Sequence, residues 1–358
     1  MRSHPLPHRR TGGIALLTAL TALSGVLATP ASAHGRGEHP VPGATLPSAC
    51  SGTAPIVCHF DVPPGNYDVT ALLGGATTAA TDVTAEQRRT VLAETATEAG
   101  HPVRRGFTVN VRAVEGEPTG DVGSEGLDLV FGGSAPLLSG LRVTPARHTP
   151  QILLVGDSTV CDQPADPYVG WGQELPQRLR RGVAVANYAD SGESTVSFLD
   201  NPLLFDQVES KIRRGDLVLV QLAHNDKTTT AEEYRANLTE MAQRVRAHGG
   251  EPVFVTPMVR RRFNSDGTLN SVALHVMAAN LPVEMRALAA ELEVPLVDLT
   301  QLSKDLVEGL GVEKSKDIYL TDINGDNTHL SAYGATTYAE LVLGSLRDQG
   351  LVSERLVR

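Results

Sequence analysis

The chain has 358 residues, of which 41% are hydrophobic and 20% are charged, and its formal net charge is −10. A chain of this length exceeds what one hydrophobic core usually covers, so we expect two domains. The acidic balance disfavours nucleic acid and anionic membrane surfaces as partners.

The first residues have the pattern of a secretory signal peptide. Three arginines give a basic start, residues 13–28 form an apolar run too short to span a membrane comfortably, and Ala31-Ser32-Ala33 is a small-residue cleavage pattern. We therefore expect residues 1–33 to be removed, with a secreted, extracellular protein that begins near His34. An uncleaved membrane anchor is the alternative.

Removal of this segment makes the chain more acidic. It takes away three arginines and no carboxylate, which leaves 28 Lys and Arg against 41 Asp and Glu, a formal charge of −13. An acidic polysaccharide would not be attracted by net charge, so such a substrate would need a locally favourable groove. No later apolar run is long enough for a second membrane segment, and we expect a monomer that does not bind a membrane after signal cleavage.

Residues 41–147 have the pattern of a small β domain. Short alternating segments, separated by Gly, Pro and Asp, are clearest at residues 67–72, 107–113 and 127–131. Several short strands with turn signals between them predict a β-sandwich. The stretch 83–99 is also compatible with a helix, although its threonines count against one.

Three cysteines are present in a chain with an export signal. Cys50 and Cys58 lie close together, and no His or Cys set at metal-ligand spacing accompanies them. In an oxidising compartment we expect them to form a disulfide, which would stabilise the fold by about 2–3 kcal/mol. Cys161 is left over, and a lone cysteine is more often a small buried hydrophobic residue than a nucleophile.

After a predicted linker at residues 145–150 the pattern changes to strand, loop and helix. The clearest helix is residues 231–248, with one apolar face and two glycines at its end, and the last is residues 332–347. Buried strands that alternate with helices predict a doubly wound, five-stranded parallel sheet over residues 150–353. The five apolar runs are residues 152–155, 183–187, 217–222, 252–256 and 295–299.

A candidate nucleophile, Ser158, directly follows the first of these strands in the turn Gly156-Asp157-Ser158-Thr159. In open α/β sheets the crevice beyond the carboxyl ends of the strands is where ligands bind. These residue types are also common in ordinary turns, so the turn alone is a weak signal of catalysis.

Later segments supply what an attacking serine needs. A serine nucleophile requires a base, a carboxylate that orients the base, and donors for the developing oxyanion. His329 is the candidate base and Asp326 the orienting acid, since a spacing of three places both side chains in one cleft from a short loop or helical turn. The candidate oxyanion donors are the N–H groups of Ser158 and Gly192, where the missing Cβ permits close approach, and the side-chain amide of Asn225.

These blocks resemble the SGNH (GDSL-type) hydrolase superfamily, and more narrowly its rhamnogalacturonan acetylesterase-like branch, carbohydrate esterase family 12. The resemblance covers about residues 151–350. It implies a flavodoxin-like sheet, a triad of Ser158, Asp326 and His329, an oxyanion hole of Ser158, Gly192 and Asn225, and no metal or organic cofactor. The matching residues are Gly156 to Thr159, Gly170-Trp171-Gly172, Asn187 to Ser194, His224-Asn225-Asp226 and Asp326 to His329.

Two departures from the family pattern leave the reactive groups in place. Ala223 stands where Gly usually precedes the His-Asn-Asp block, and Cys161 stands where a small residue is common. The segment before the hydrolase part resembles a galactose-binding-like module more weakly. That resemblance implies a sugar-binding domain, and a packing domain without a ligand is the alternative.

Two further features have two interpretations each. Trp171 either stacks on a sugar or packs in the core, and we assign it and His224 as tentative substrate-binding residues. The run Arg260-Arg261-Arg262 is either a solvated loop or part of a groove for an acidic substrate.

The sequence therefore predicts a secreted carboxylic ester hydrolase that removes acetyl groups from a plant cell-wall polysaccharide, foremost acetylated rhamnogalacturonan in pectin. One alternative is a secreted lipase or small-molecule esterase on the same scaffold, although no long apolar lid is visible and only 4% of residues are aromatic. An alternative of another class is a catalytically silent carbohydrate-binding protein. The intact Ser158, Asp326 and His329 count against that alternative.

Overall fold

A computed structural model describes residues 47–113, 115–120 and 123–358 of the chain. The predicted signal peptide and residues 41–46 of the predicted first domain lie outside the described residues. Within the described residues, no helix is both long and apolar enough to cross a membrane.

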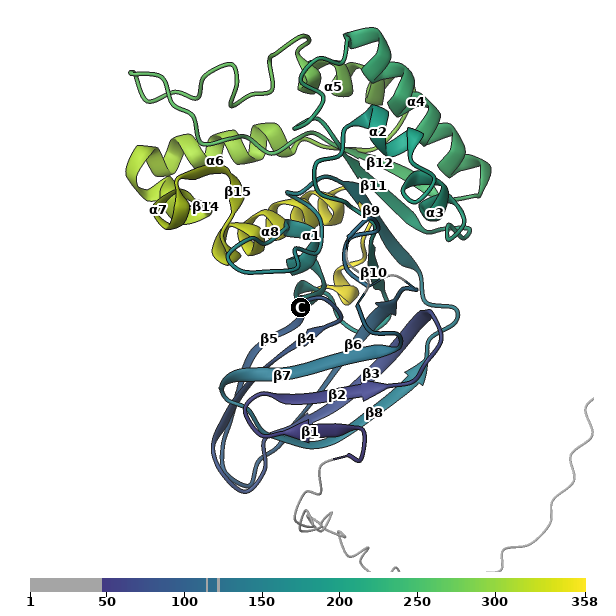
Figure 1. Ribbon diagram of the computed structural model, residues 1–358, viewed down its shortest axis with the longest axis vertical. Helices are drawn as coiled ribbons and strands as arrows, with labels where there is room; N and C mark the ends of the chain where they lie inside the picture. Colours follow the sequence, from purple (N-terminus) through teal and green to yellow (C-terminus); the bar gives the residue numbers. More distant parts are fainter. Residues whose placement is uncertain (1–46, 114, 121–122) are drawn as a thin grey trace, which may run out of the picture. The chain divides into compact units, whose positions relative to one another are not determined.

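Eight antiparallel strands form two sheets between residues 50 and 145 (Figure 1). Alternate side chains, such as Val69 and Ala71 of one sheet and Leu129 and Phe131 of the other, are buried in one shared core. The predicted β-sandwich and its three clearest strands are confirmed. One sheet has the order β1 (Cys50–Gly52), β2 (Ile56–Phe60), β7 (Leu127–Ala135), β4 (Ala79–Ala85), β5 (Arg89–Thr97), and the other β6 (Val103–Val111), β3 (Gly65–Leu73), β8 (Leu138–Pro145).

The helix considered for residues 83–99 is wrong, because this stretch belongs to the hairpin of β4 and β5. Buried and half-buried residues alternate along β4, as expected for a strand with one face on the core. Threonine, which is β-branched, favours a pleated strand over a helix. Glu86 and Arg88 turn the chain with φ of 51° and 59°, in the left-handed region.

The predicted disulfide is present between Cys50 and Cys58, which are paired residues of β1 and β2. Cys161 is free and fully buried. Burial, together with the nearby Glu117 carboxylate, raises the pKa of the Cys161 thiol well above its ordinary value. The thiol is therefore protonated and is not a competing nucleophile.

The second half of the chain contains the predicted five-stranded parallel sheet (Figure 1). All neighbouring strands are parallel, and the order places the strand that precedes Ser158 between the strands that precede Gly192 and Asn225. The strands in order are β10 (Ala184–Asn187), β9 (Gln151–Gly156), β11 (Leu217–Gln221), β12 (Glu251–Val255) and β13 (Leu296–Val297).

Helices cover both faces of this sheet, so the doubly wound fold is confirmed. Along β9, Ile152 and Leu154 belong to a core shared with α8, whereas Leu153 and Val155 belong to a core shared with α4. This alternation explains why residues 152–155 of β9 are all apolar. The helices are α1 (Trp171–Glu174), α2 (Thr195–Asp200), α3 (Phe205–Glu209), α4 (Ala231–Ala247), α5 (Leu281–Glu291), α6 (Leu299–Lys314), α7 (Thr321–Asn324) and α8 (Ala332–Asp348).

The remaining elements are short. A two-stranded antiparallel sheet carries the segment with Asp326 and His329. It consists of β14 (Tyr319–Leu320) and β15 (Asp326–Leu330), and the 3-10 turns are η1 (Leu175–Arg178), η2 (Ser315–Ile318) and η3 (Glu354–Leu356).

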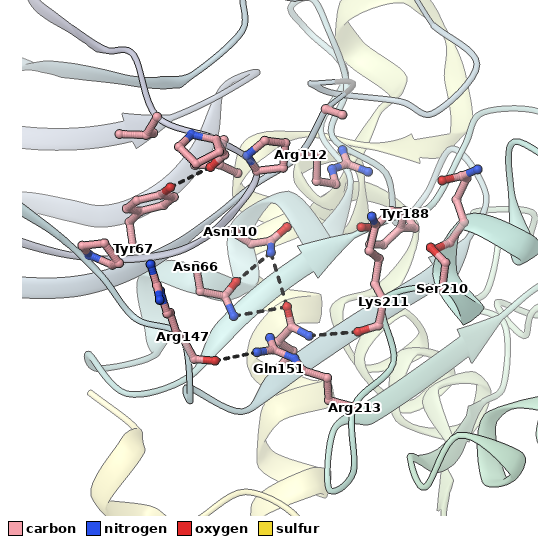
Figure 2. A pocket seen from close by; sticks show the side chains of 18 of the residues that line it. Asn66, Tyr67, Asn110, Arg112, Arg147, Gln151, Tyr188, Ser210, Lys211 and Arg213 are labelled. Atoms are coloured by element: carbon pink, nitrogen blue, oxygen red, sulfur yellow. Dashed lines mark hydrogen bonds between the residues drawn. The ribbon is translucent and has the colours of Figure 1, made fainter.

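The described residues belong to one compact unit, in which the sandwich and the parallel sheet share buried polar contacts. Oε1 of Gln151, the first residue of β9, accepts hydrogen bonds from the side-chain amides of Asn66 (3.2 Å) and Asn110 (3.4 Å) (Figure 2). Arg89 of β5 donates twice to Oδ2 of Asp162, at 2.7 and 3.0 Å, and both side chains are buried. These paired buried groups hold the sandwich against the chain segment that follows Ser158.

Candidate active site

The serine turn begins where β9 ends, at Gly156. A Cβ at this position would lie 2.6 Å from Cγ2 of Val160, so the turn requires glycine. Oδ1 of Asp157 accepts hydrogen bonds from the backbone N–H (2.9 Å) and the hydroxyl (2.7 Å) of Thr159. The resulting tight turn presents Ser158, half-buried, at the carboxyl edge of the sheet.

Ser158, His329 and Asp326 form a continuous chain of hydrogen bonds. Oγ of Ser158 lies 2.9 Å from Nε2 of His329, and Nδ1 of His329 lies 2.6 Å from Oδ2 of Asp326. Because an ionised carboxylate only accepts hydrogen bonds, Nδ1 carries the proton and Nε2 is the acceptor for the serine hydroxyl. The structure therefore brings together the three side chains that the sequence predicted, across 171 positions of chain.

The segment that carries the base is the strand β15, and the predicted short loop or helical turn is wrong. Oδ1 of Asp326 accepts the backbone N–H groups of Thr328 (2.7 Å) and His329 (3.1 Å). Burial alone would raise the pKa of Asp326, but hydrogen bonds from the His329 ring and from these two N–H groups lower it overall. Asp326 is thus held as an anion beside the imidazole.

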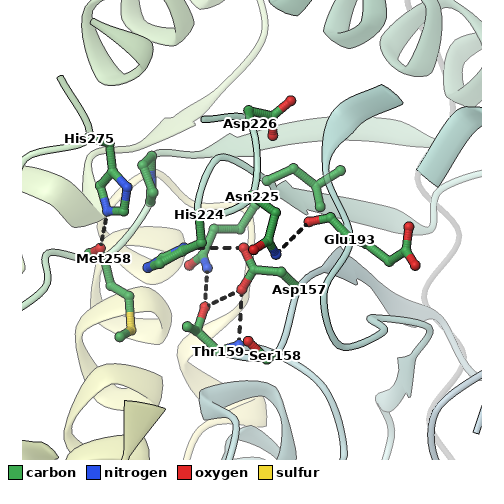
Figure 3. Close-up of polar contacts among 12 residues, drawn as sticks. Asp157, Ser158, Thr159, Glu193, His224, Asn225, Asp226, Met258 and His275 are labelled. Carbon is green, nitrogen blue, oxygen red and sulfur yellow. Dashed lines mark hydrogen bonds and ion pairs between the residues drawn. The ribbon is translucent and has the colours of Figure 1, made fainter. Parts of the chain in front are cut away.

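The three predicted oxyanion donors lie on the loops after β9, β10 and β11. Within the part of the chain that the structure describes, the N–H groups of Ser158 and Gly192 make no hydrogen bond. Gly192 has φ +87° and no atom within 4 Å of its missing Cβ, so its backbone conformation is what requires glycine. Nδ2 of Asn225 donates to the carbonyl of Glu193 at 3.0 Å, which leaves its second hydrogen available (Figure 3).

Asp226 connects the loops that carry Gly192 and Asn225. Its Oδ1 accepts the backbone N–H (3.0 Å) and the hydroxyl (2.5 Å) of Thr195, the first residue of α2. It also accepts the hydroxyl of Thr229 at 3.1 Å. This buried carboxylate fixes the relative position of two oxyanion donors that come from different loops.

The substrate-binding role predicted for His224 is wrong, since its side chain is only 2% exposed. Burial lowers the pKa of His224 despite the nearby Asp157, so the ring is neutral. Its Nδ1 lies 3.1 Å from Oδ2 of Asp157 and donates to it (Figure 3). Burial alone would raise the pKa of Asp157, but contacts with His224 and Thr159 lower it to about 2. His224 therefore stabilises the serine turn through its hydrogen bond to Asp157 and does not face the solvent.

The sugar-stacking role predicted for Trp171 is also wrong. Its side chain is fully buried in the core beneath the parallel sheet. Its indole Nε1 donates to Oε1 of Gln221 at 2.9 Å, and Nε2 of Gln221 donates to the hydroxyl of Thr159 at 2.8 Å. Of the two interpretations, core packing is the one that the structure supports.

Two arginines of the basic run hold the segment that carries the base. Arg260 donates to the hydroxyl of Thr328 at 3.2 Å and to the carbonyl of His224 at 2.8 Å. Arg261 donates to Oδ1 of Asn327 at 3.0 Å. Because their partners lie more than 30 positions away in sequence, the run itself held no signal of this role.

Sequence reasoning also missed a contact from the sandwich to the oxyanion loop. Glu117 accepts the backbone N–H of Ser191 at 2.6 Å and its hydroxyl at 3.0 Å. Thr119 donates to Asp190 from its N–H (2.8 Å) and from its hydroxyl (2.6 Å). Gly192 directly follows Ser191 in the chain. Glu117 and Thr119 therefore fix the backbone that presents the N–H group of Gly192.

No group of three or more His, Cys, Asp or Glu side chains that could hold a metal ion occurs within the described residues. The described residues supply a nucleophile with its base, an orienting anion and three candidate oxyanion donors on loops that follow neighbouring strands. These are the parts that acyl transfer requires.

Comparisons with known proteins agree with this geometry. The model of the GDSL-like Lipase/Acylhydrolase family matches residues 154–336. Rhamnogalacturonan acetylesterase RhgT of Bacillus subtilis (strain 168) is 38% identical over 217 residues, which cover 56% of this chain and 91% of that protein. The uncharacterized esterase YxiM of the same organism is 30% identical over 310 residues, which cover 82% of this chain and 74% of that protein.

The crystal structure of the protein YxiM from Bacillus subtilis is similar in fold. Its sequence is 26% identical, the TM-score is 0.53, and the match covers 83% of this chain and 80% of that chain. The family model covers the segment from the serine turn to the start of the last helix, which includes every predicted triad residue. The chain therefore belongs to the GDSL-like Lipase/Acylhydrolase family and is an ester hydrolase, as its resemblance to the SGNH hydrolases and their rhamnogalacturonan acetylesterase-like branch predicted.

Proposed function

We propose that this protein is a secreted serine esterase that removes acetyl groups from a plant cell-wall polysaccharide, foremost acetylated rhamnogalacturonan. The observation that carries the proposal is the hydrogen-bonded chain from Ser158 through His329 to Asp326. The substrate class rests on the similarity to RhgT, which is named a rhamnogalacturonan acetylesterase.

In the proposed reaction, Oγ of Ser158 attacks the acetyl carbonyl while Nε2 of His329 takes the hydroxyl proton. The negative charge that develops on the carbonyl oxygen is stabilised by the N–H groups of Ser158 and Gly192 and by the amide of Asn225. When the sugar oxygen leaves, His329 returns the proton to it as the sugar hydroxyl. Water then attacks the acetyl-enzyme by the same route, which releases acetate and restores Ser158.

Export is the second part of the proposal. It rests on the basic start, the apolar run of residues 13–28 and the small-residue site that follows it. The Cys50–Cys58 disulfide agrees with an oxidising compartment. Mass spectrometry of protein recovered from the culture medium should find a chain that begins near His34, and an unprocessed chain retained in the cell would contradict export.

The substrate class is tested by measuring acetate released from acetylated rhamnogalacturonan, acetylated xylan and chitin, alongside the hydrolysis of long-chain esters. We expect the highest kcat/KM on acetylated rhamnogalacturonan. Preference for long-chain esters would replace the proposal with the lipase alternative and leave the triad untouched. Absence of turnover on every ester, with sugar binding retained, would favour the silent carbohydrate-binding protein.

A further inference from the structure

A large cavity lies outside the triad, where the sandwich packs against the parallel sheet. It has a volume of about 1090 Å³ and is lined by residues of β3, β6, β9 and the segment between α3 and β11. Small-molecule sites typically enclose about 300–1,000 Å³, so this space is large enough for several sugar rings. None of the residues assigned to the triad or the oxyanion hole lines it.

The charged groups that line this cavity all have one sign. Four cationic side chains contribute to it, and none of its described lining residues is Asp or Glu. In a chain with 41 acidic and 31 basic residues, this is a local reversal of charge. Figure 2 labels these four residues among those that line the cavity. They are Arg112, Arg147, Lys211 and Arg213.

Two of these cations are available to a ligand. Arg147 and Lys211 are exposed, and among the described residues their side chains have no ion-pair or hydrogen-bond partner. Arg213, by contrast, already lies 3.7 Å from Oδ2 of Asp216. Unpaired ammonium and guanidinium groups at the rim of a cavity attract anions. The distance over which this attraction acts becomes shorter as the salt concentration rises.

The floor of the cavity offers buried polar atoms that lack partners. The amides of Asn66, Asn110 and Gln151 bind one another there, and Oδ1 of Asn110 is buried without a hydrogen-bond donor. Nε of Arg112 is also buried without an acceptor. A buried polar atom without a partner is costly. A ligand hydroxyl would donate to Oδ1 of Asn110, and a ligand hydroxyl or carboxylate oxygen would accept from Nε of Arg112.

Aromatic rings complete the lining. Tyr67, Tyr188 and Phe60 contribute to the wall, and the guanidinium of Arg112 lies 4.9 Å from the centre of the Tyr188 ring. Amphipathic rings beside amides and fixed cations suit a ligand that has apolar ring faces, hydroxyl groups and negative charge.

The cavity is joined to the active site by the chain itself. Tyr188 lines the cavity, and the same loop continues through Asp190 and Ser191 to Gly192. Pro118, in the segment between β6 and β7, also lines the cavity. Its two neighbours in the chain, Glu117 and Thr119, are the residues that bind the loop before Gly192. A polymer that enters the cavity would therefore lie beside the loop that presents an oxyanion donor.

We infer that this cavity binds an oligosaccharide segment that carries uronic-acid carboxylates, through Arg147 and Lys211 at its rim and the amides of its floor. The inference rests on the proposed function, since it names the acidic part of the same polymer substrate. It also answers the expectation that an acidic polysaccharide needs a locally favourable groove in an acidic protein.

The test is calorimetric titration of full-length mature Ser158→Ala protein with trigalacturonate and with the neutral galactotriose. We expect trigalacturonate to bind, galactotriose to bind at least tenfold more weakly, and the trigalacturonate affinity to fall as NaCl is raised. In this background, Lys211→Gln combined with Arg147→Gln should weaken trigalacturonate binding roughly tenfold, about 1.4 kcal/mol, because both unpaired cations are removed.

The matched control is Arg214→Gln, which removes the same charge from an exposed residue that does not line the cavity. It should bind trigalacturonate like the parent, and the thermal unfolding midpoint of every variant reports whether the fold is intact. Equal affinity for the two trisaccharides, or equal loss in the control and the double variant, would overturn the inference. Acetate release from acetylated rhamnogalacturonan without trigalacturonate binding would overturn it too, while leaving the proposed function standing.

Discussion

The carboxylate of Asp326 makes the contacts that set the tautomer of the base, His329. One oxygen accepts two backbone N–H groups and the other accepts Nδ1 of His329 at 2.6 Å. The backbone bonds fix the carboxylate, and the carboxylate fixes the tautomer of the imidazole. Residue type and spacing identified this pair, because the base and its orienting acid are two side chains three positions apart in one short segment.

Replacing Asp326 with Asn should lower kcat by roughly 10³–10⁴, because an amide presents a donor to Nδ1 and favours the wrong tautomer. The measurement is steady-state hydrolysis of a small acetyl ester. The control is Asp322→Asn, an exposed carboxylate four residues earlier whose nearest cation, Lys316, is 3.9 Å away. Equal activity of the two variants would remove Asp326 from the triad.

Glu117 is a positioning residue for the oxyanion loop, because it binds both the N–H and the hydroxyl of Ser191. Glu117→Gln retains the shape but can accept only one of these bonds. We expect kcat to fall about tenfold, a part of the loss seen when one oxyanion donor is removed, with KM nearly unchanged.

A purely structural role of Glu117 would lower the unfolding midpoint and leave kcat of the folded protein intact. The expected result is the reverse, a lower kcat at an unchanged midpoint. Glu98→Gln, at an exposed position of the same sandwich, is the control and should match the parent in both measurements.

Burial is what residue type alone did not predict. Residue type left Trp171 open between stacking on a sugar and packing in the core, and it suggested His224 as a tentative substrate-binding residue, yet both side chains are buried. Their partners, Gln221 and Asp157, lie 50 and 67 positions away in sequence. Only the fold brings these residues together, and no local pattern encodes such pairs.

The elements of the parallel sheet were predictable because each has a local cause. Its strands are apolar runs that are buried on both faces, and α4 has Tyr234, Leu238, Met241 and Val245 buried on one face, at the predicted spacing. The strand character of β15 was not predictable, because its partner β14 is only two residues long. The turn between β4 and β5 was also hard to predict, because Glu86 and Arg88 adopt left-handed φ although neither is glycine, the residue that usually marks such a turn.

The turn of this hairpin predicts a pH-dependent stability. Burial raises the pKa of Glu86 from 4.5 to about 8. The Glu115 and Asp128 carboxylates add smaller increases, and the Arg89 guanidinium acts in the opposite direction. Between these values the folded chain keeps a proton that the unfolded chain has lost. The stabilisation is therefore complete below about pH 4.5 and is lost as the pH rises to about 8.

Glu86→Gln replaces the titratable carboxyl group with an amide that does not titrate. Relative to the parent, its free energy of unfolding should rise by a few kcal/mol, on the order of 1.4 kcal/mol per pH unit, between pH 5 and pH 8. Urea unfolding at several pH values measures this difference. Glu125→Gln, at an exposed position, should show none, and a pH-independent gap for Glu86→Gln would mean that Glu86 is ionised in the folded state.

At the scale of the whole molecule, two architectures share one function in this account. The loops of the parallel sheet supply the nucleophile and the oxyanion donors, and β15 of the two-stranded sheet supplies the base. The sandwich contributes Glu117, Thr119 and Arg89 to the segments around them. An acidic chain with a cationic cavity beside its oxyanion loop is suited to an acidic polymer. Composition indicated that an acidic polysaccharide, if it is the substrate, would need a locally favourable groove, and only the assembled fold brings the four cationic side chains together around one cavity.

The role of Ser158 as the nucleophile is tested by acetate release from acetylated rhamnogalacturonan by the parent and by Ser158→Ala. A serine nucleophile predicts that the variant folds normally and loses roughly six orders of magnitude in kcat. Ser265→Ala, at an exposed serine outside the site, should release acetate like the parent. Turnover by Ser158→Ala at the rate of the parent would contradict the account, because no other side chain on the serine turn lies within hydrogen-bonding distance of His329.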